Sequence, residues 1–228
     1  MAFVIKSTST VTNDGVRISL AGQSGTGKTF SLRTLSRPLI LSSEKGLLSL
    51  KGYDLPYVEI NSTKDLKDAL EEIKKPEVWD NIDTIAIDSI SDIAEKCLIE
   101  NKKKTKDGRA AYGNLTDEVI DTLNDICSLK GKDIVCIFKL SRIEDPDTGK
   151  VTYGAATVTD KLALKMPYIF DEVLILQTSV TEENGIMRYI QTFNDSHYLA
   201  KDRSGCLDPY EPADLGLIIS KIKGGVNG

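Results

Sequence analysis

Apolar residues recur along this chain at two spacings, one typical of strands and one typical of helices. In segment 16–21 apolar and polar residues alternate, whereas Leu66, Leu70 and Ile73 follow one another at intervals of four and three, as on one helix face. Segment 133–138 is almost wholly apolar, as is typical of a buried parallel strand. Because strand-like and helix-like segments alternate, the pattern predicts an α/β fold with a three-layer, largely parallel, twisted sheet covered by helices on both faces.

The predicted elements extend over most of the chain. Strands are expected at 16–21, 38–42, 57–60, 84–88, 133–138, 172–176 and 187–193, and helices at 29–35, 63–74, 90–100, 115–129 and 215–222. Thr63 is a candidate N-cap for the second helix, because its hydroxyl can accept from a free backbone N–H. We expect one domain over 1–228 with its core at about 16–222, a short N-terminal extension at 1–15 and a flexible tail at 224–228.

The composition is that of an ordinary globular protein. The 228 residues are 40% hydrophobic and 28% charged with a net charge of −5, so contact with nucleic acid would need a local basic patch. We find no apolar run long enough to span a membrane and no secretory signal, so we expect no membrane partner and a cytoplasmic location. The widely spaced cysteines are typical of reduced thiols, and the single histidine, His197, argues against histidine-based catalysis.

A glycine-rich segment at 22–29 matches the phosphate-binding P-loop pattern G-x-x-x-x-G-K-[ST] in full. It lies between a predicted strand and a predicted helix, which is the setting that the motif requires. Its glycines let the backbone approach an anion, and the helix N-terminus directs free N–H groups and the positive end of its dipole at that anion. The motif therefore predicts a nucleotide bound with Mg²⁺. The expected nucleotide-binding residues are Gly22, Gln23, Ser24, Gly25, Thr26, Gly27, Lys28, Thr29 and Phe30.

An acidic residue ends one of the predicted strands. Asp88 closes the apolar segment 84–88, where a buried carboxylate needs a cation or hydrogen-bond donors. Together with the Thr29 hydroxyl it supplies the oxygen ligands that Mg²⁺ prefers. The alternative is that Asp88 caps the following helix.

A second acid is needed to orient the water that attacks a phosphate. The residue after Asp88 is Ser89, so this group must come from elsewhere in the chain. Glu44 follows the predicted strand 38–42, and parallel strands bring their C-terminal ends together at one sheet edge. Glu44 is therefore the candidate, and a surface ion pair with Lys45 is the alternative.

The order of these motifs resembles the RecA-type ATPase core. In that family the catalytic glutamate follows the second core strand, as Glu44 does, and the strand of the Walker B motif ends in an aspartate, as at Asp88. The resemblance implies ATP as the nucleotide, with Lys28 and Glu44 among the catalytic residues. It also implies a γ-phosphate sensor after the next strand, where Lys139 and Ser141 stand; Lys139 replaces an amide of the family.

A further match lies at 200–205, which reads Ala-Lys-Asp-Arg-Ser-Gly. It resembles the K-x-R element of RecA and hexameric helicase cores, whose two cations reach the nucleotide of the neighbouring subunit and act there in catalysis. Residues two apart on an extended segment point the same way, so Lys201 and Arg203 can address one phosphate together. The alternative is a solvated basic turn. The resemblance implies self-association in a ring or filament with shared active sites.

RecA-like cores bind single-stranded DNA through two loops, which correspond here to 101–113 and 141–157. The first segment carries five cations, one acid and one aromatic ring, as a groove for phosphates and stacked bases requires. Part of the second segment is acidic, and a lysine-rich run is alternatively solvated surface. The expected DNA-binding residues are Lys102, Lys103, Lys104, Lys106, Arg109, Tyr112 and Arg142.

The resemblance covers about 17–203 and is strongest to small phage-encoded proteins of the single-strand annealing (Sak-type) group. It implies an ATP-dependent protein that binds single-stranded DNA and promotes annealing or strand pairing in phage recombination in the host cytoplasm. A phage or host single-stranded-DNA-binding protein would be a further partner. Another RecA-core motor, such as a helicase or packaging ATPase, and a nucleotide-gated DNA-binding module with little hydrolysis are the alternatives. A small-molecule kinase would need an acceptor pocket and a lid, which the sequence does not indicate.

Overall fold

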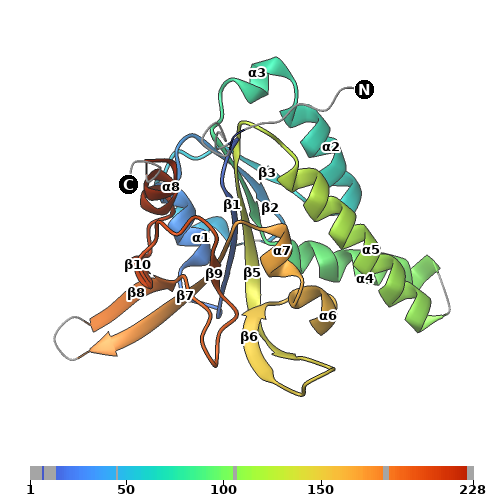
Figure 1. The fold of residues 1–228 in the computed structure, drawn as a ribbon. Coiled ribbons are helices and arrows are strands. Elements are labelled where there is room, and N and C mark those ends of the chain that lie inside the picture. Colours follow the sequence, from blue (N-terminus) through green and yellow to red (C-terminus); the bar gives the residue numbers. More distant parts are fainter. Residues whose placement is uncertain (1–6, 8–13, 45, 105–106, 182–184, 225–228) are drawn as a thin grey trace.

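A twisted sheet runs through the part of the chain that the computed structural model describes, residues 7, 14–44, 46–104, 107–181 and 185–224 (Figure 1). Its strands follow the order β10-β8-β7-β1-β5-β4-β2-β3, and β6 and β9 pair with β5 and β7. The strands are β1 (Arg17–Gly22), β2 (Pro38–Ser42), β3 (Tyr57–Glu59), β4 (Thr84–Asp88), β5 (Asp133–Glu144), β6 (Val151–Ala155), β7 (Glu172–Thr181), β8 (Gly185–Gln191), β9 (Lys201–Asp202) and β10 (Tyr210–Pro212).

The centre of the sheet is parallel. Strand β1 pairs with β5 on one side and β7 on the other, and all of its residues are buried. Strand β5 pairs in turn with β4, and β4 with β2, so one strand separates β1 from β4. The C-terminal ends of β1, β2 and β4 therefore meet at one edge of the sheet, which is where open α/β sheets bind their ligands.

Helices cover both faces of this sheet, as Figure 1 shows. Within the described residues, one apolar cluster packs Leu66, Ile93 and Leu123 of α2, α4 and α5 against one face. A second cluster packs Leu32 and Ile218 against the other face. The predicted three-layer α/β fold is confirmed. The helices are α1 (Lys28–Ser31), α2 (Thr63–Ile73), α3 (Pro76–Trp79), α4 (Ile90–Lys104), α5 (Gly108–Cys127), α6 (Asp160–Ala163), α7 (Met166–Ile169) and α8 (Leu215–Gly224), with 3₁₀ helices at Leu32–Thr34 and Leu47–Leu50.

The two segments predicted as DNA-facing loops have regular structure, so that part of the prediction is wrong. In the first, α4 continues to Lys104 and α5 begins at Gly108. Lysine, arginine and alanine are strong helix formers, which explains why both helices extend into it. In the second, β5 continues through Glu144 and pairs antiparallel with β6, forming a hairpin.

Smaller predictions at the ends of elements also differ from the structure. The N-cap of α2 is Ser62 rather than Thr63, since the Ser62 hydroxyl accepts from the Asp65 N–H at 3.1 Å. The predicted strand 172–176 continues to Thr181 and forms an antiparallel hairpin with β8. Most of the expected N-terminal extension and tail lies outside the described residues.

Candidate functional site

The P-loop, residues 22–29, connects the end of β1 to the start of α1. Gly22 is the last residue of β1, and Gly25 and Gly27 have φ values of +81° and +100°, which favour glycine. A Cβ atom at Gly22 would lie 2.9 Å from Thr26 Oγ1 and 2.8 Å from the Leu176 carbonyl oxygen, so this position has no room for a side chain. The loop is therefore a tight backbone cradle at the C-terminal edge of the sheet.

The Lys28 ammonium is folded over this cradle. Its Nζ donates to the carbonyl oxygens of Gly22 at 2.8 Å and Gln23 at 2.9 Å. Burial lowers the pKa of Lys28, while the negative charges of Glu44 and Asp88 raise it in part. The amine is thus held within the loop by weak neutral acceptors that an anion can replace.

Thr29 and Asp88 meet at the first turn of α1. The Thr29 hydroxyl donates to Asp88 Oδ2 at 2.6 Å, and Asp88 is 1% exposed. Burial raises the pKa of Asp88, against the hydrogen bond from Thr29 and the charge of Lys28. A hydroxyl and a carboxylate suit Mg²⁺, which takes one or two protein oxygens together with phosphate oxygens. The donor set therefore fits a magnesium nucleotide.

Glu44 lies next to the end of β4. Backbone bonds to the Asp88 carbonyl oxygen, from Ser43 at 2.7 Å and Glu44 at 3.4 Å, hold this segment in place. The Ser89 hydroxyl lies 2.9 Å from Glu44 Oε1 and 2.6 Å from Asp92 Oδ2. Hydrogen bonding with Asp92 and burial raise the pKa of Glu44 to about 7.

Asp92, on the first turn of α4, is a site residue that the sequence analysis missed. Burial opposes its ionisation, but hydrogen bonds from Glu44, Ser89 and Lys139 together lower its pKa to about 2. The hydrogen bond between the two carboxyl groups therefore raises the pKa of Glu44 and lowers that of Asp92. Helix periodicity gave no reason to single out Asp92, because acidic residues are common in a first helical turn.

The two candidate sensors have different positions. Lys139 pairs with Gly22 across β5 and β1, and its Nζ lies 2.9 Å from both Asp92 Oδ1 and Glu95 Oε1. The hydrogen bond with Asp92 raises the pKa of Lys139 despite partial burial. Ser141 stands two residues further along, opposite Gly154 in the hairpin of β5 and β6. Lys139 therefore belongs to the charged cluster beside the P-loop, and Ser141 to the base of the hairpin.

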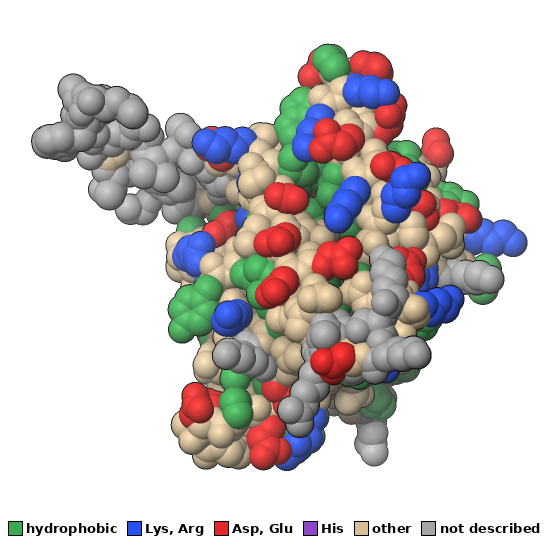
Figure 2. Space-filling view, turned by 90° about the vertical axis from the view of Figure 1, so that its right-hand side faces the viewer, with side chains coloured by type: hydrophobic (Ala, Val, Ile, Leu, Met, Phe, Trp, Pro, Cys, Tyr) green, Lys and Arg blue, Asp and Glu red, His purple; other side chains and the backbone are tan. Residues whose placement is uncertain are grey.

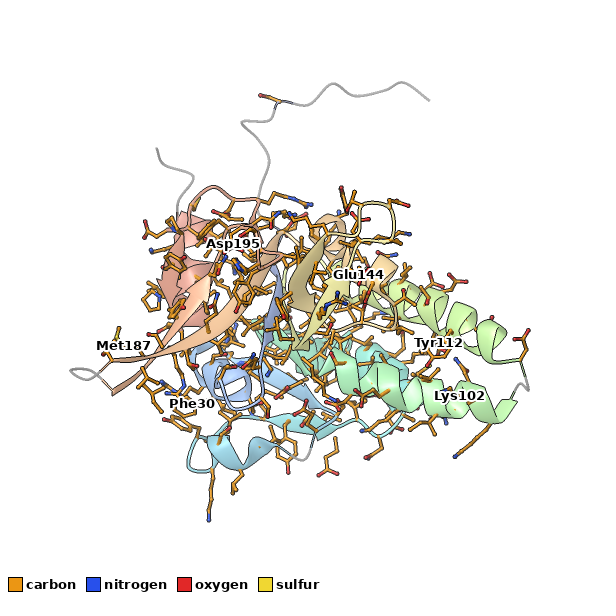
Figure 3. The ribbon with its side chains drawn as sticks, turned by 90° about the horizontal axis from the view of Figure 1, so that it is seen from below. Phe30, Lys102, Tyr112, Glu144, Met187 and Asp195 are labelled. Carbon is orange, nitrogen blue, oxygen red and sulfur yellow. The ribbon has the colours of Figure 1, made fainter. Side chains whose placement is uncertain are left out.

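A cleft of about 620 Å³ lies along the P-loop, a volume typical of small-molecule sites. Lys28, Thr29, Phe30 and Glu44 line it, together with Arg188 of β8. The sequence analysis also missed Arg188, because the register that brings β8 to the P-loop is not visible in the sequence. Met187 is the neighbour of Arg188 in the hairpin of β7 and β8. Figure 3 shows Met187 and Phe30 at the same end of the molecule.

Comparison with known proteins gives the family. Residues 14–204 match the AAA domain family, which is most of the chain. The chain belongs to this family. It is also 26% identical over 210 residues to the SPbeta prophage-derived uncharacterized protein YorG of Bacillus subtilis (strain 168), covering 87% of this chain and 62% of that protein. The chain thus spans less than two thirds of this curated relative.

Among solved structures, this AAA domain is similar to the crystal structure of the RadB recombinase, with a TM-score of 0.45 and 13% sequence identity. The similarity covers 77% of this chain and 79% of that one. In the described part of the AAA domain, no helix is long and apolar enough to cross a membrane.

Lys201 and Arg203 lie far from the P-loop of their own chain. Strand β9 pairs with the first residues of β7, at the N-terminal edge of the sheet. The Lys201 ammonium donates to the carbonyl oxygens of Pro167 and Phe170, and Arg203 Nη1 lies 2.7 Å from Asp171 Oδ1. Burial and the charge of Arg203 lower the pKa of Lys201. Both cations therefore have partners within their own AAA domain.

The predicted DNA-binding residues are spread over two places. Lys102 and Tyr112 face each other where α4 and α5 meet, with Lys102 Nζ 5.3 Å from the ring centre, and Lys103 is exposed. Figure 3 shows Lys102 and Tyr112 at the opposite end of the molecule from Phe30. Arg142 lies on the hairpin of β5 and β6, 2.9 Å from Glu144. Lys106 and the side chains of Lys104 and Arg109 lie outside the described residues.

A second cleft lies on the other side of Glu44. It has a volume of about 600 Å³ and is lined by residues that include Ser43, Glu44, Tyr57 and Lys96. The Lys96 ammonium closes its base by donating to the carbonyl oxygens of Ser43 at 2.8 Å and Ile60 at 3.0 Å. The sequence analysis found no such pocket, because its wall is formed by residues from β2, β3 and α4 that meet only in the fold.

Proposed function

We propose that this AAA domain protein is an ATPase that binds ATP with Mg²⁺ and single-stranded DNA, and that it promotes annealing or strand pairing in phage recombination. The observation that carries the proposal is the 2.6 Å hydrogen bond between Asp88 and Thr29, which lines a cleft together with Lys28 and Glu44. These groups supply the phosphate contact, the metal ligands and the acid that ATP hydrolysis requires.

Each residue has a distinct part in the proposed reaction. The N–H groups at the start of α1 and the Lys28 ammonium hold phosphate oxygens, which replace the loop carbonyls that Lys28 now contacts. Thr29 and Asp88 would hold Mg²⁺, which would neutralise negative charge on the phosphates. Glu44 accepts a hydrogen bond from the attacking water and orients it.

Asp92 and Lys139 position Glu44. Ser89 and Asp92 hold the Glu44 carboxyl group from one side, and Lys139 balances the negative charge of Asp92. A carboxylate held in this way keeps one orientation in the cleft, as a water-positioning group requires. Lys139 would thus act as a sensor through this cluster, with Ser141 further along β5 as the weaker candidate.

The DNA-binding part of the proposal rests on the resemblance to RecA cores and on the cations at the end of α4. Lys102, Lys103 and Tyr112 combine phosphate contact with an exposed ring, which is the combination that single strands require. Figure 2 shows acidic and basic side chains interspersed over the face that carries α2, α4 and α5. Binding would therefore be confined to the junction of α4 and α5. Similarity to a prophage-derived protein supports the phage setting.

Self-association is proposed from the K-x-R element. Lys201 and Arg203 lie at the sheet edge opposite the P-loop, so a head-to-tail arrangement would bring them to the nucleotide of the next subunit. Arg203 has the more exposed side chain, at 53%, and its ion pair with Asp171 is the contact more easily exchanged. A ring and a filament both satisfy this arrangement.

The central experiment is ATP hydrolysis measured with and without single-stranded DNA, on protein whose oligomeric state is known from light scattering. We expect slow, Mg²⁺-dependent turnover that DNA stimulates. Glu44→Gln is expected to lower kcat about 100-fold or more while nucleotide binding persists. Glu77→Gln, at an exposed position of α3, is the control and should leave kcat unchanged. Binding without turnover in the wild type would instead indicate a nucleotide-gated module.

Two assays separate the remaining functions. Annealing of complementary strands without processive duplex unwinding supports the proposal, and processive unwinding would indicate a motor. The cleft of about 600 Å³ beside Glu44 favours a phosphotransferase as second candidate, because an acceptor could reach the same carboxyl group there. ATP consumed without release of inorganic phosphate, in the presence of an acceptor, would identify that activity.

A further inference from the structure

Arg188 reaches the P-loop from the side opposite to Glu44 and Asp88. It lies on β8, opposite Thr178 of β7, and β7 pairs with β1. Asp88 ends β4 and Glu44 follows β2, and both strands lie on the other side of β1, beyond β5. Arg188 nevertheless lines the same cleft of about 620 Å³. The cleft thus has Glu44 on one side of the P-loop and an arginine on the other.

The Arg188 side chain is fixed to the loop by one of its donors. Its Nε lies 3.0 Å from the carbonyl oxygen of Thr26 and donates to it. A Cβ atom at Gly27 would lie 3.1 Å from this nitrogen, so the glycine that begins the G-K-T part of the motif leaves room for the arginine. The guanidinium group is therefore held directly beside the phosphate-binding backbone.

The rest of the guanidinium group is available to a ligand. Arg37, Arg142 and Arg203 each have a carboxylate within ion-pair distance, whereas Arg188 has none among the described residues. An arginine has five N–H donors in a fixed fork, and the bond to Thr26 uses one of them. The two terminal nitrogens can therefore bind an anion while Nε keeps the side chain in place.

We propose that Arg188 binds the phosphates that stay on the nucleoside, and so holds ATP and ADP alike from within the same subunit. This inference rests on the proposed nucleotide site. The phosphate that is transferred must face Glu44, the candidate acid for water, on the opposite wall. An arginine on the other wall therefore contacts the phosphates nearer the nucleoside. Because its contacts are the same before and after hydrolysis, it contributes to affinity and leaves the chemical step unchanged.

Titration calorimetry with Mg²⁺–ADP and with a non-hydrolysable ATP analogue tests this proposal. Arg188→Ala is expected to weaken both ligands equally, by about 10- to 100-fold, as loss of a charged hydrogen-bonding group predicts. Arg188→Lys should recover part of this loss, because a lysine keeps the charge but has no fork to hold Thr26 and phosphate together. Lys130→Ala, an exposed position just before β5, removes the same charge at the other sheet edge and should bind as the wild type does.

Steady-state kinetics add a second measurement, in which Arg188→Ala raises KM for ATP while kcat at saturation stays within about twofold. Unchanged binding by Arg188→Ala overturns the proposal, as does a loss confined to the triphosphate or a fall in kcat at saturation. If Arg188→Ala does not fold, Arg188→Lys serves as the test. Wild-type nucleotide affinity in Arg188→Lys would then overturn the proposal. Absence of binding by the wild type overturns both this proposal and the nucleotide site, whereas wild-type binding with an unaffected variant overturns the role of Arg188 alone.

Discussion

The Thr29 hydroxyl donates a hydrogen bond to Asp88 Oδ2 over 2.6 Å, which joins the first turn of α1 to the end of β4. The two residues are 59 positions apart in the chain, and β5 lies between β4, which Asp88 ends, and β1, which precedes the P-loop. Burial raises the pKa of Asp88 because one hydroxyl donor compensates a buried carboxylate poorly. A divalent cation bound at this pair would therefore supply the positive charge that the protein itself does not provide for the Asp88 carboxylate.

Replacing this carboxylate should separate stability from activity. Asp88→Asn keeps an oxygen acceptor for Thr29 and removes a buried charge, so we expect the free energy of unfolding without nucleotide to stay the same or rise by about 1 kcal/mol. ATP hydrolysis should fall about 100-fold or more, because the metal loses its charged ligand. Urea denaturation and a phosphate-release assay measure the two effects. Marked destabilisation without loss of hydrolysis would show that Asp88 caps α4 and holds no metal.

Local sequence was sufficient for the parts of the site that lie within one motif or one strand end. The P-loop is contiguous, and its position between a strand and a helix follows from hydrophobic pattern. The meeting of Glu44 with Asp88 follows from one further step, since β2 and β4 are parallel neighbours with Ser42 opposite Asp88. Each of these inferences requires only the direction of a strand, and none requires knowledge of how side chains pack.

Asp92 and Arg188 could not be predicted in the same way. Asp92 becomes part of the site because Ser89 turns its hydroxyl between two carboxyl groups and Lys139 approaches from β5. Arg188 depends on the register of an antiparallel hairpin, in which a shift by one residue would turn its side chain to the other face. The resemblance to RecA cores predicts a loop at 101–113, although helix propensity favours the extension of α4 and α5 into this segment.

A buried carboxyl group at the opposite edge of the sheet should make stability depend on pH. Glu172 begins β7, is fully buried, and its Oε2 has no hydrogen-bond partner among the described residues. Burial and the neighbouring charge of Asp202 raise its pKa to about 8. The folded state therefore binds this proton more tightly than the unfolded state, and stability is lost as the pH rises from about 4.5 to about 8.

Glu172→Gln should remove that loss, because an amide stays neutral at every pH. Relative to the wild type, its free energy of unfolding should increase with pH across this window by at most about 1.4 kcal/mol per pH unit. Denaturation in urea at pH 5, 6, 7, 8 and 9 (about one unit apart, spanning the window) measures the difference. Glu77→Gln, at an exposed position, should show no such trend. Parallel curves for wild type and Glu172→Gln would contradict the prediction.

Replacing Lys201 should destabilise the protein more than replacing Arg203. Lys201→Ala leaves the carbonyl oxygens of Pro167 and Phe170 without their donor, so we expect about 1–3 kcal/mol of destabilisation. Arg203→Ala breaks a largely exposed ion pair with Asp171 and should cost less than about 1 kcal/mol.

Arg203→Ala is therefore the cleaner test of a shared active site. If Arg203 reaches the nucleotide of a neighbouring subunit, this variant should lose ATP turnover about 10-fold or more with little change in stability. Mixing it with Glu44→Gln protein should restore some activity, because mixed assemblies contain intact sites at certain junctions. Wild-type turnover by Arg203→Ala, measured at a concentration where the protein is oligomeric, would rule out the role in trans.

The cations at the junction of α4 and α5 make a prediction about salt. Lys102 and Lys103 lie on the last turn of α4, with Lys102 beside the Tyr112 ring, and each phosphate contact releases counterions from the DNA. The double change of Lys102 and Lys103 to Ala should weaken binding to single-stranded DNA and reduce the slope of log affinity against log salt by about 1.4, roughly 0.7 for each contact. Fluorescence anisotropy over a series of salt concentrations measures both quantities.

Changing Lys74 and Lys75 to Ala removes the same charge at the end of α2, where each lysine pairs with a glutamate, and should leave the slope unchanged. Equal slopes for the two double variants would mean that DNA, if bound, contacts another surface of this protein.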